Sequence, residues 1–130
     1  AGKGVDSFDD GSDASEIVKS VAKKLNCTVV ASGITDLVSD GEKVYKIFNG
    51  TYKLKKITGT GCMSSSLIAS FLPCTDKSIE AAFMGTLAMS LSGELADVTN
   101  PGVGTFKTYL FNNIDSLDVN TFEKYAKVEF

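Results

Sequence analysis

Histidine and tryptophan are absent from this sequence of 130 residues, and proline occurs only twice. Without histidine, the chain offers no Ser-His-Asp or Cys-His catalytic group and no histidine-ligated metal. The three cysteines, Cys27, Cys62 and Cys74, have no C-x-x-C spacing, and their odd number disfavours a disulfide framework and a zinc site. We therefore predict no metal site built from this chain's own residues, and a reducing, cytoplasmic setting.

Long apolar runs and blocks of positive charge are also missing. No apolar run approaches the roughly 18 residues of a membrane span, and the first residues, AGKGVDSFDDG, lack the apolar core of a signal peptide. The net charge of −3 disfavours nucleic acid and anionic membranes as partners. With 43% hydrophobic and 22% charged residues, the composition is typical of a globular domain.

The pattern of apolar residues predicts an αβ alternation followed by helices. A first helix is expected over residues 12–25, with Asp13 and Glu16 as a capping box. Its apolar side would consist of Ile17, Val18, Val21 and Leu25. The run CTVVA at 27–31 is typical of a strand that a parallel sheet buries on both faces. After a DG turn, residues 44–48 read as a strand that ends at Asn49-Gly50.

Four further helices are expected in the second half of the chain. They cover residues 62–72, stopped near Pro73, then 76–97, whose small residues predict close packing, then 102–114, and a short helix over 119–127 capped at Asn120. The fold class is α/β, a doubly wound sheet. Two or three strands are few for so much helix, which indicates that the chain is part of a larger domain.

The stretch KITGTGCMSSSLIASFL, residues 56–72, is the strongest candidate site. Glycines bracket Thr60 just before a helix, where unpaired N–H groups and the positive end of the helix dipole favour an anion. A thiol at such a position, that of Cys62, is favoured in its reactive thiolate form. The spacing fits neither a Walker A loop nor G-x-G-x-x-G. A tight turn with a buried cysteine remains an equal alternative.

Four other segments carry weaker signals. Ser32-Gly33 follows an apolar strand, where a hydroxyl and flexible backbone suit a phosphate, although a simple turn is the favoured interpretation. GVGTF at 102–106 is either a loop closing the same pocket or a helix start, and Glu94 and Asp97 in SGELAD are interpreted as a solvated face. The acidic stretch 6–16 fails as an EF-hand because its third and twelfth positions are Phe8 and Ile17.

Taken in order, these motifs resemble hydroxyethylthiazole kinase, a thiamine-salvage enzyme of the ribokinase-like superfamily. The resemblance consists of KGVDS, ASGxxDxVxDG, NG-x5-KxTGTGC-x3-SLIASF, SGELA and GVGTF, and it runs over essentially the whole chain. It implies that residues 1–130 are the C-terminal half of the kinase domain, so that a missing N-terminal half is a partner. The family loop reads GPGSF, and the change to GVGTF puts that loop's contacts in doubt.

The resemblance also implies a reaction and residue roles. The family transfers phosphate from ATP, with Mg²⁺, to the hydroxyl of 4-methyl-5-(2-hydroxyethyl)thiazole in thiamine biosynthesis. Carried over, Gly59, Thr60 and Gly61 form the anion hole, Gly59 also contacts the thiazole, Cys62 is catalytic, and Ser32 and Gly33 bind ATP. The metal ligands are expected outside this chain. A trimer or hexamer is implied, as is a fusion to thiamine-phosphate synthase if the chain comes from the bifunctional fungal protein.

Two alternatives stay open at this point. The first is another ribokinase-like kinase, for example one that acts on a sugar or a pyrimidine, although Cys62 in place of the superfamily's aspartate argues against it. A non-catalytic half that serves oligomerisation or ligand binding is the second alternative. The predicted helix over residues 76–97, which is rich in small residues, and the missing partner segment keep this alternative open.

Overall fold

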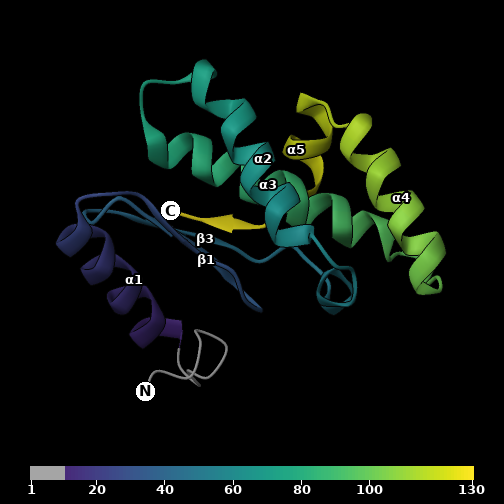
Figure 1. Cartoon of the computed structure of the whole chain (residues 1–130), viewed down its shortest axis with the longest axis horizontal. Coiled ribbons are helices and arrows are strands. Elements are labelled where there is room, and N and C mark those ends of the chain that lie inside the picture. The colour runs from purple at the N-terminus through teal and green to yellow at the C-terminus, as the bar shows by residue number, and fades with distance from the viewer. Residues whose placement is uncertain (1–10) are drawn as a thin grey trace.

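The computed structural model describes residues 11–130, and Figure 1 shows how the elements are arranged. The helices are α1 (Gly11–Leu25), α2 (Thr60–Phe71), α3 (Ser78–Ala96), α4 (Val103–Asp115) and α5 (Val119–Tyr125), with short 3₁₀ helices η2 (Tyr52–Lys56) and η3 (Leu72–Cys74). The strands are β1 (Val29–Ala31), β2 (Asp36–Ser39), β3 (Val44–Ile47) and β4 (Val128–Glu129). The five predicted helices are thus present. Strands β2 and β4 and the 3₁₀ helix η2 were not predicted from the sequence.

The four strands form one antiparallel sheet in the order β1-β2-β3-β4. In the register, Val38 pairs with both Val30 and Tyr45, and Ile47 pairs with Val128. The prediction of a parallel strand over residues 27–31 is therefore wrong for the strands of this chain. The strand is also not buried on both faces, since Val30 is 37% exposed. Short loops connect β1, β2 and β3, and short connections favour antiparallel neighbours.

Helices cover both faces of this sheet, as the α/β class requires. On one face, Ala14 and Val18 of α1 pack on Ala31 and Leu37. On the other face, α3 packs its apolar residues on Val38 and Ile47. Every residue of β2 is buried, because α1 and α3 sandwich this strand. A separate cluster around Phe106 joins α4 to α3 and to the start of α2.

The DG turn between β2 and β3 forms as predicted. Asp40 Oδ1 accepts the N–H groups of Glu42 and Lys43, at 2.9 and 3.0 Å, and the Ser39 hydroxyl donates to the Lys43 carbonyl at 2.6 Å. These backbone hydrogen bonds, chiefly that from Lys43, lower the pKa of Asp40. The turn thus brings Asp36, the first residue of β2, opposite Ile47 at the end of β3.

Two helix details differ from the sequence predictions. Helix α1 begins at Gly11, so Asp13 lies in its first turn and is not the cap. Its buried side is Ala14, Val18 and Ala22, whereas Ile17, Val21 and Leu25 are 39%, 38% and 63% exposed. Helix α5 is capped by Asp118, whose carboxylate accepts the Thr121 N–H at 2.8 Å, and not by Asn120. The part of the acidic stretch before residue 11 lies outside the described residues.

Close packing of α2 on α3, predicted from the small residues of α3, occurs at Gly85. A Cβ added there would lie 2.4 Å from the backbone nitrogen of Ile68 in α2. Only glycine fits a contact of this kind, because ordinary carbon contacts lie at about 3.5–4.0 Å. Gly85 therefore sets how closely α2, and with it the glycine turn at residues 59–61, approaches α3. None of the helices in residues 11–130 is long and apolar enough to cross a membrane.

A buried lysine holds η2 in place. Lys53 is 4% exposed, and its Nζ donates to Asp97 Oδ1 at 2.6 Å, Asn100 Oδ1 at 2.7 Å and the Pro101 carbonyl at 2.8 Å. The ammonium group has three donors, so its hydrogen bonding is complete. It ties η2 to the loop between α3 and α4.

Candidate functional site

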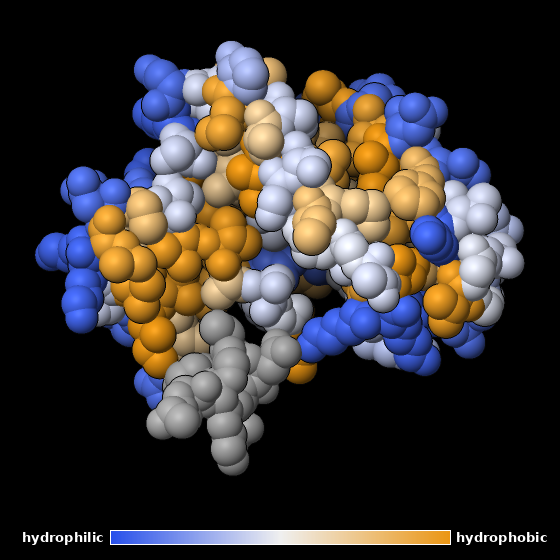
Figure 2. Space-filling view, viewed as in Figure 1, coloured by the Kyte–Doolittle hydropathy of each residue, from blue (hydrophilic) through white to orange (hydrophobic). Residues whose placement is uncertain are grey.

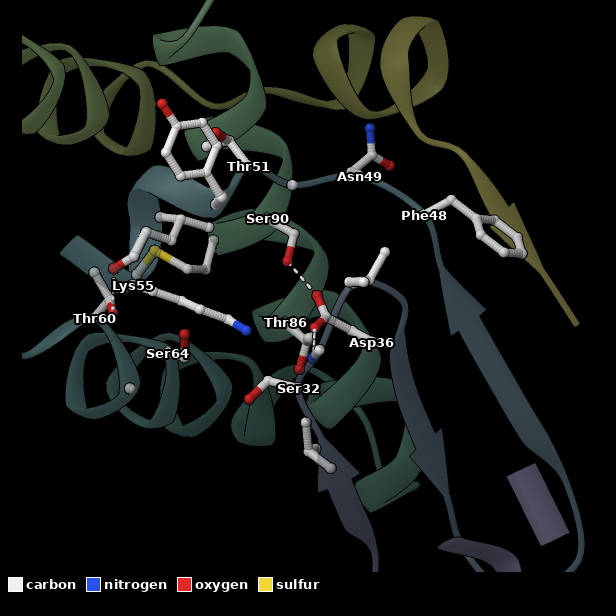
Figure 3. A pocket seen from close by; sticks show the side chains of 18 of the residues that line it. Ser32, Asp36, Phe48, Asn49, Thr51, Lys55, Thr60, Ser64, Thr86 and Ser90 are labelled. Carbon is white, nitrogen blue, oxygen red and sulfur yellow. Dashed lines mark hydrogen bonds between the residues drawn. The ribbon is translucent and has the colours of Figure 1, made fainter. Parts of the chain in front are cut away.

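A cleft of about 670 Å³ opens beside the N-terminus of α2. Its walls come from the end of β1 and the loop that leads to Asp36, the segment from Phe48 through η2, the first three turns of α2, and the middle of α3. Figure 3 shows the polar side chains that face it. Ser32 and Gly33 on one side and Thr60 and Gly61 on the other all line this cleft. The two segments to which the resemblance assigns ATP binding and the anion hole therefore line one cleft.

The N-terminus of α2 presents backbone N–H groups at the cleft. Gly59 is the N-cap with φ of 96°, a left-handed conformation that favours glycine, and no side chain caps the helix. The first intrahelical bond runs from Met63 N to the Gly59 carbonyl at 2.9 Å. The Thr60 hydroxyl donates to the Leu54 carbonyl at 3.1 Å. Thr60 therefore offers its backbone N–H to a ligand, while its side chain fastens the turn to η2.

Asp36 holds the loop after β1. Its Oδ1 accepts the Gly33 N–H at 3.0 Å, and its Oδ2 accepts the Ser90 hydroxyl of α3. Asp36 is only 6% exposed. Because it bonds both the loop and α3, this carboxylate sets the position of Ser32 and Gly33 over the cleft (Figure 3). The quoted motif ASGxxDxVxDG contains Asp36, so the signal was visible in the sequence, although no role was assigned to it.

Further polar side chains line the cleft and were not predicted as site residues, among them Lys55 of η2, Ser64 of α2 and Thr86 of α3. In Figure 3 the Lys55 side chain extends into the cleft toward the side that carries Ser32, Asp36 and Thr86. The lining also contains apolar and aromatic side chains, among them Phe48, Tyr52 and Met89.

Gly59 and Cys62 lie next to the cleft without lining it. Both are exposed, at the start of α2. Cys27 and Cys74 are exposed as well, so the expectation that Cys27 is enclosed in a buried strand is wrong. Solvent exposure alone therefore does not distinguish Cys62 from the other two cysteines. A role for Cys62 or Gly59 stays a prediction, and it requires a ligand that extends outward from the cleft past the turn.

The remaining sequence candidates have structural roles. GVGTF starts α4, with Gly102 as its N-cap, and it does not line the described cleft. The prediction that Glu94 and Asp97 form a solvated face is wrong. Glu94 accepts from Asn49 Nδ2 at 2.6 Å and pairs with Lys127 at 2.9 Å. The hydrogen bond from Lys53, followed by that from Thr51, lowers the pKa of Asp97.

A comparison with known proteins shows the family to which this chain belongs. The family model described as the hydroxyethylthiazole kinase family matches residues 1–120. The chain belongs to the hydroxyethylthiazole kinase family. It is 55% identical over 129 residues to a hydroxyethylthiazole kinase of Clostridioides difficile, and 44% identical over 131 residues to one of Alkaliphilus oremlandii. These matches cover 99% and 98% of this chain.

A solved structure confirms the fold class. The chain superposes with a TM-score of 0.86 and 29% identity on the hydroxyethylthiazole kinase protein from Pyrococcus horikoshii OT3, over 91% of this chain and 46% of that one. Its α/β, ribokinase-like architecture is therefore that of the hydroxyethylthiazole kinase family. The chain spans about half the length of the curated relatives it matches, 49% and 48% of the two named above.

Proposed function

We propose that this chain is the C-terminal half of a hydroxyethylthiazole kinase that transfers the γ-phosphoryl group of ATP to the hydroxyl of 4-methyl-5-(2-hydroxyethyl)thiazole. The observation that carries the proposal is the convergence of Ser32-Gly33 and the Thr60-Gly61 turn on one cleft, in a chain of this family. The first segment would bind the nucleotide and the second the transferring phosphoryl group, with Gly59 beside the thiazole.

The proposed catalysis depends on charge stabilisation at the start of α2. Backbone N–H groups of Thr60, Gly61 and Cys62 precede the first intrahelical bond, so they are placed to bind phosphoryl oxygens. Phosphoryl transfer needs positioning and electrostatics more than covalent chemistry. The Cys62 thiolate would accept the proton of the substrate hydroxyl. A loose transition state releases that proton late, so a modest base suffices.

Mg²⁺ accompanies ATP in the proposal, but the described residues do not form a site for it. They contain no group of three or more histidine, cysteine, aspartate or glutamate side chains that could hold a metal. Asp36 is the one carboxylate in the cleft lining, and each of its oxygens already accepts a hydrogen bond. As the resemblance implies, we expect the magnesium ligands outside this chain.

We propose that the N-terminal half of the enzyme is the partner of this chain. The face of this chain on which it would dock is apolar. Figure 2 shows apolar surface gathered over α1 and the neighbouring sheet edge. The residues are Ile17, Val21 and Leu25 of α1 and Val30 of β1, which are 37% to 63% exposed. Strand β1 is an edge of the described sheet, and edge strands tend to pair with another segment. We propose that the missing half covers this face, in a cytoplasmic homo-oligomer, a trimer or hexamer.

The decisive assay for the reaction is phosphoryl transfer by the complete enzyme from ATP to a panel of alcohols. We expect turnover of the thiazole alcohol and none of sugars or pyrimidine alcohols. Turnover of a sugar alone would instead indicate another ribokinase-like kinase, and no turnover with normal oligomerisation would indicate a non-catalytic module. The mass of the native protein would show whether a thiamine-phosphate synthase domain is fused to it.

Cys62 is tested by substitution in the same assay. Cys62→Ala should lower kcat for the thiazole alcohol by on the order of 10²–10⁴, while ATP affinity changes little, because the backbone N–H groups remain. Cys62→Asp should retain activity, since a carboxylate also accepts the proton. Cys27→Ser and Cys74→Ser, at the other two exposed thiols, are the matched controls. Full activity of Cys62→Ala would show that the thiol is not a base.

A further inference from the structure

Thr86 is a buried hydroxyl without a partner at the floor of the cleft. The residue is 5% exposed, and its Oγ1 has no hydrogen-bond partner among the described residues. A buried hydroxyl left unbonded costs about 1–3 kcal/mol, so most such groups are satisfied by something. Thr86 lies in the cleft lining, where a ligand oxygen would satisfy it.

The charge balance of the cleft indicates what kind of ligand this is. Lys55 and Asp36 are the two charged residues in the lining, and the N-terminus of α2 adds the positive end of its dipole. The Asp36 carboxylate is engaged by Gly33 and Ser90. The cleft lining thus includes the Lys55 side chain and the Thr86 hydroxyl, both labelled in Figure 3, beside the N–H groups at the start of α2. All of these groups are able to donate hydrogen bonds. Lys55 carries a full positive charge, and the helix N-terminus carries a partial one.

From this arrangement we propose that Lys55 and Thr86 are phosphate-binding residues, which hold the oxygens of a nucleotide's phosphate chain beside the N-terminus of α2. This inference rests on the proposed kinase function and deepens it. Lys55 supplies the charge that compensates Asp36, without which an anion in the cleft would face an uncompensated carboxylate. Thr86 donates its hydroxyl hydrogen to a phosphate oxygen. Neither residue reacts; both position the phosphate chain against the helix N-terminus.

The chain contains a matched control for each residue. Lys56 is the next lysine of the same 3₁₀ helix, but its Nζ lies over the Tyr52 ring, 5.0 Å from the ring centroid, and it does not line the cleft. Ser92 is the second buried hydroxyl of α3 without a partner, and it also lies outside the cleft lining. Lys56→Met and Ser92→Ala therefore make the same chemical changes away from the proposed site.

The experiment measures binding of ATP, inorganic tripolyphosphate and adenosine to the complete enzyme by titration calorimetry, without any acceptor alcohol. Lys55→Met should weaken ATP and tripolyphosphate about tenfold or more at low salt, because hydrogen bonds to charged groups are strong, and should leave adenosine unchanged. The loss should shrink with added salt, since the exposed Lys55 is screened. Thr86→Val should weaken both phosphate probes about threefold to tenfold without lowering the unfolding temperature.

Lys56→Met and Ser92→Ala should bind all three probes as the wild type does. Equal affinities for Lys55→Met and Lys56→Met, or for Thr86→Val and Ser92→Ala, would overturn the inference while leaving the proposed kinase intact. A wild-type enzyme that binds neither ATP nor tripolyphosphate would overturn the proposed function, and the inference with it. The two failures are thus distinguishable.

Discussion

Replacing Gly85 by alanine tests whether the contact between α2 and α3 places the anion site. The added Cβ would lie 2.4 Å and 2.5 Å from the backbone nitrogen and Cα of Ile68. Ordinary contact requires about 3.5 Å, so the two helices would have to separate by roughly 1 Å. Because the opposing atoms belong to the backbone of a helix, a side-chain rotation does not relieve the overlap.

The expected loss in the free energy of unfolding is the difference between two opposing contributions. Overpacking a core costs about 1–3 kcal/mol, and the upper end applies here because backbone must move. Alanine returns about 1 kcal/mol through its better helix propensity. Gly85→Ala should therefore lower the free energy of unfolding by about 2 kcal/mol. It should also weaken ATP binding, since the N-terminus of α2 moves with the helix.

Gly93→Ala in the same helix is the matched control. Its Cβ would meet the tip of the Leu54 side chain at 2.9 Å, and that side chain is able to shift. Both variants gain the same helix propensity, so the difference in their urea unfolding midpoints isolates the packing contact. We expect Gly93→Ala to stay within about 1 kcal/mol of the wild type. If Gly85→Ala proved as stable as Gly93→Ala and bound ATP normally, α2 would not be positioned by this contact.

Two further predictions concern the ion pair that holds η2. Lys53→Met should lower the free energy of unfolding by about 3 kcal/mol, since it leaves Asp97 without its buried partner, and a loss near zero in chemical denaturation would contradict this. Because the folded-state pKa of Asp97 is lowered, its carboxylate stabilises the fold above the usual aspartate pKa of about 4, and this contribution is lost as pH falls through the folded value. The stability difference between the wild type and Asp97→Asn, measured by denaturation at a series of pH values, should therefore shrink below about pH 4; a constant difference would refute it.

Elements with strong local signals were predictable from the sequence. The helix over 76–97 and the stop near Pro73 appear as α3 and at the end of α2, because proline and apolar spacing act within a few residues. The turn at Asp40-Gly41 forms for the same reason. Strand direction was not predictable in this way. The run at 27–31 has the composition of a buried parallel strand, but its direction depends on β2, with which it pairs only after the chain has folded.

The candidate site was likewise predictable only where its signal lies within one short segment. By itself, the sequence determined that Ser32-Gly33 ends a strand, that a glycine turn precedes a helix expected from residue 62, and the family to which this pattern belongs. Only the tertiary structure decided that Lys55, Asp36 and Thr86 join them in one cleft. It also gave Asp97 a buried lysine partner 44 residues away in the sequence. Spacing along the chain reports the face of one helix or strand, whereas the packing of α3 against the sheet and α2 decides which side chains meet.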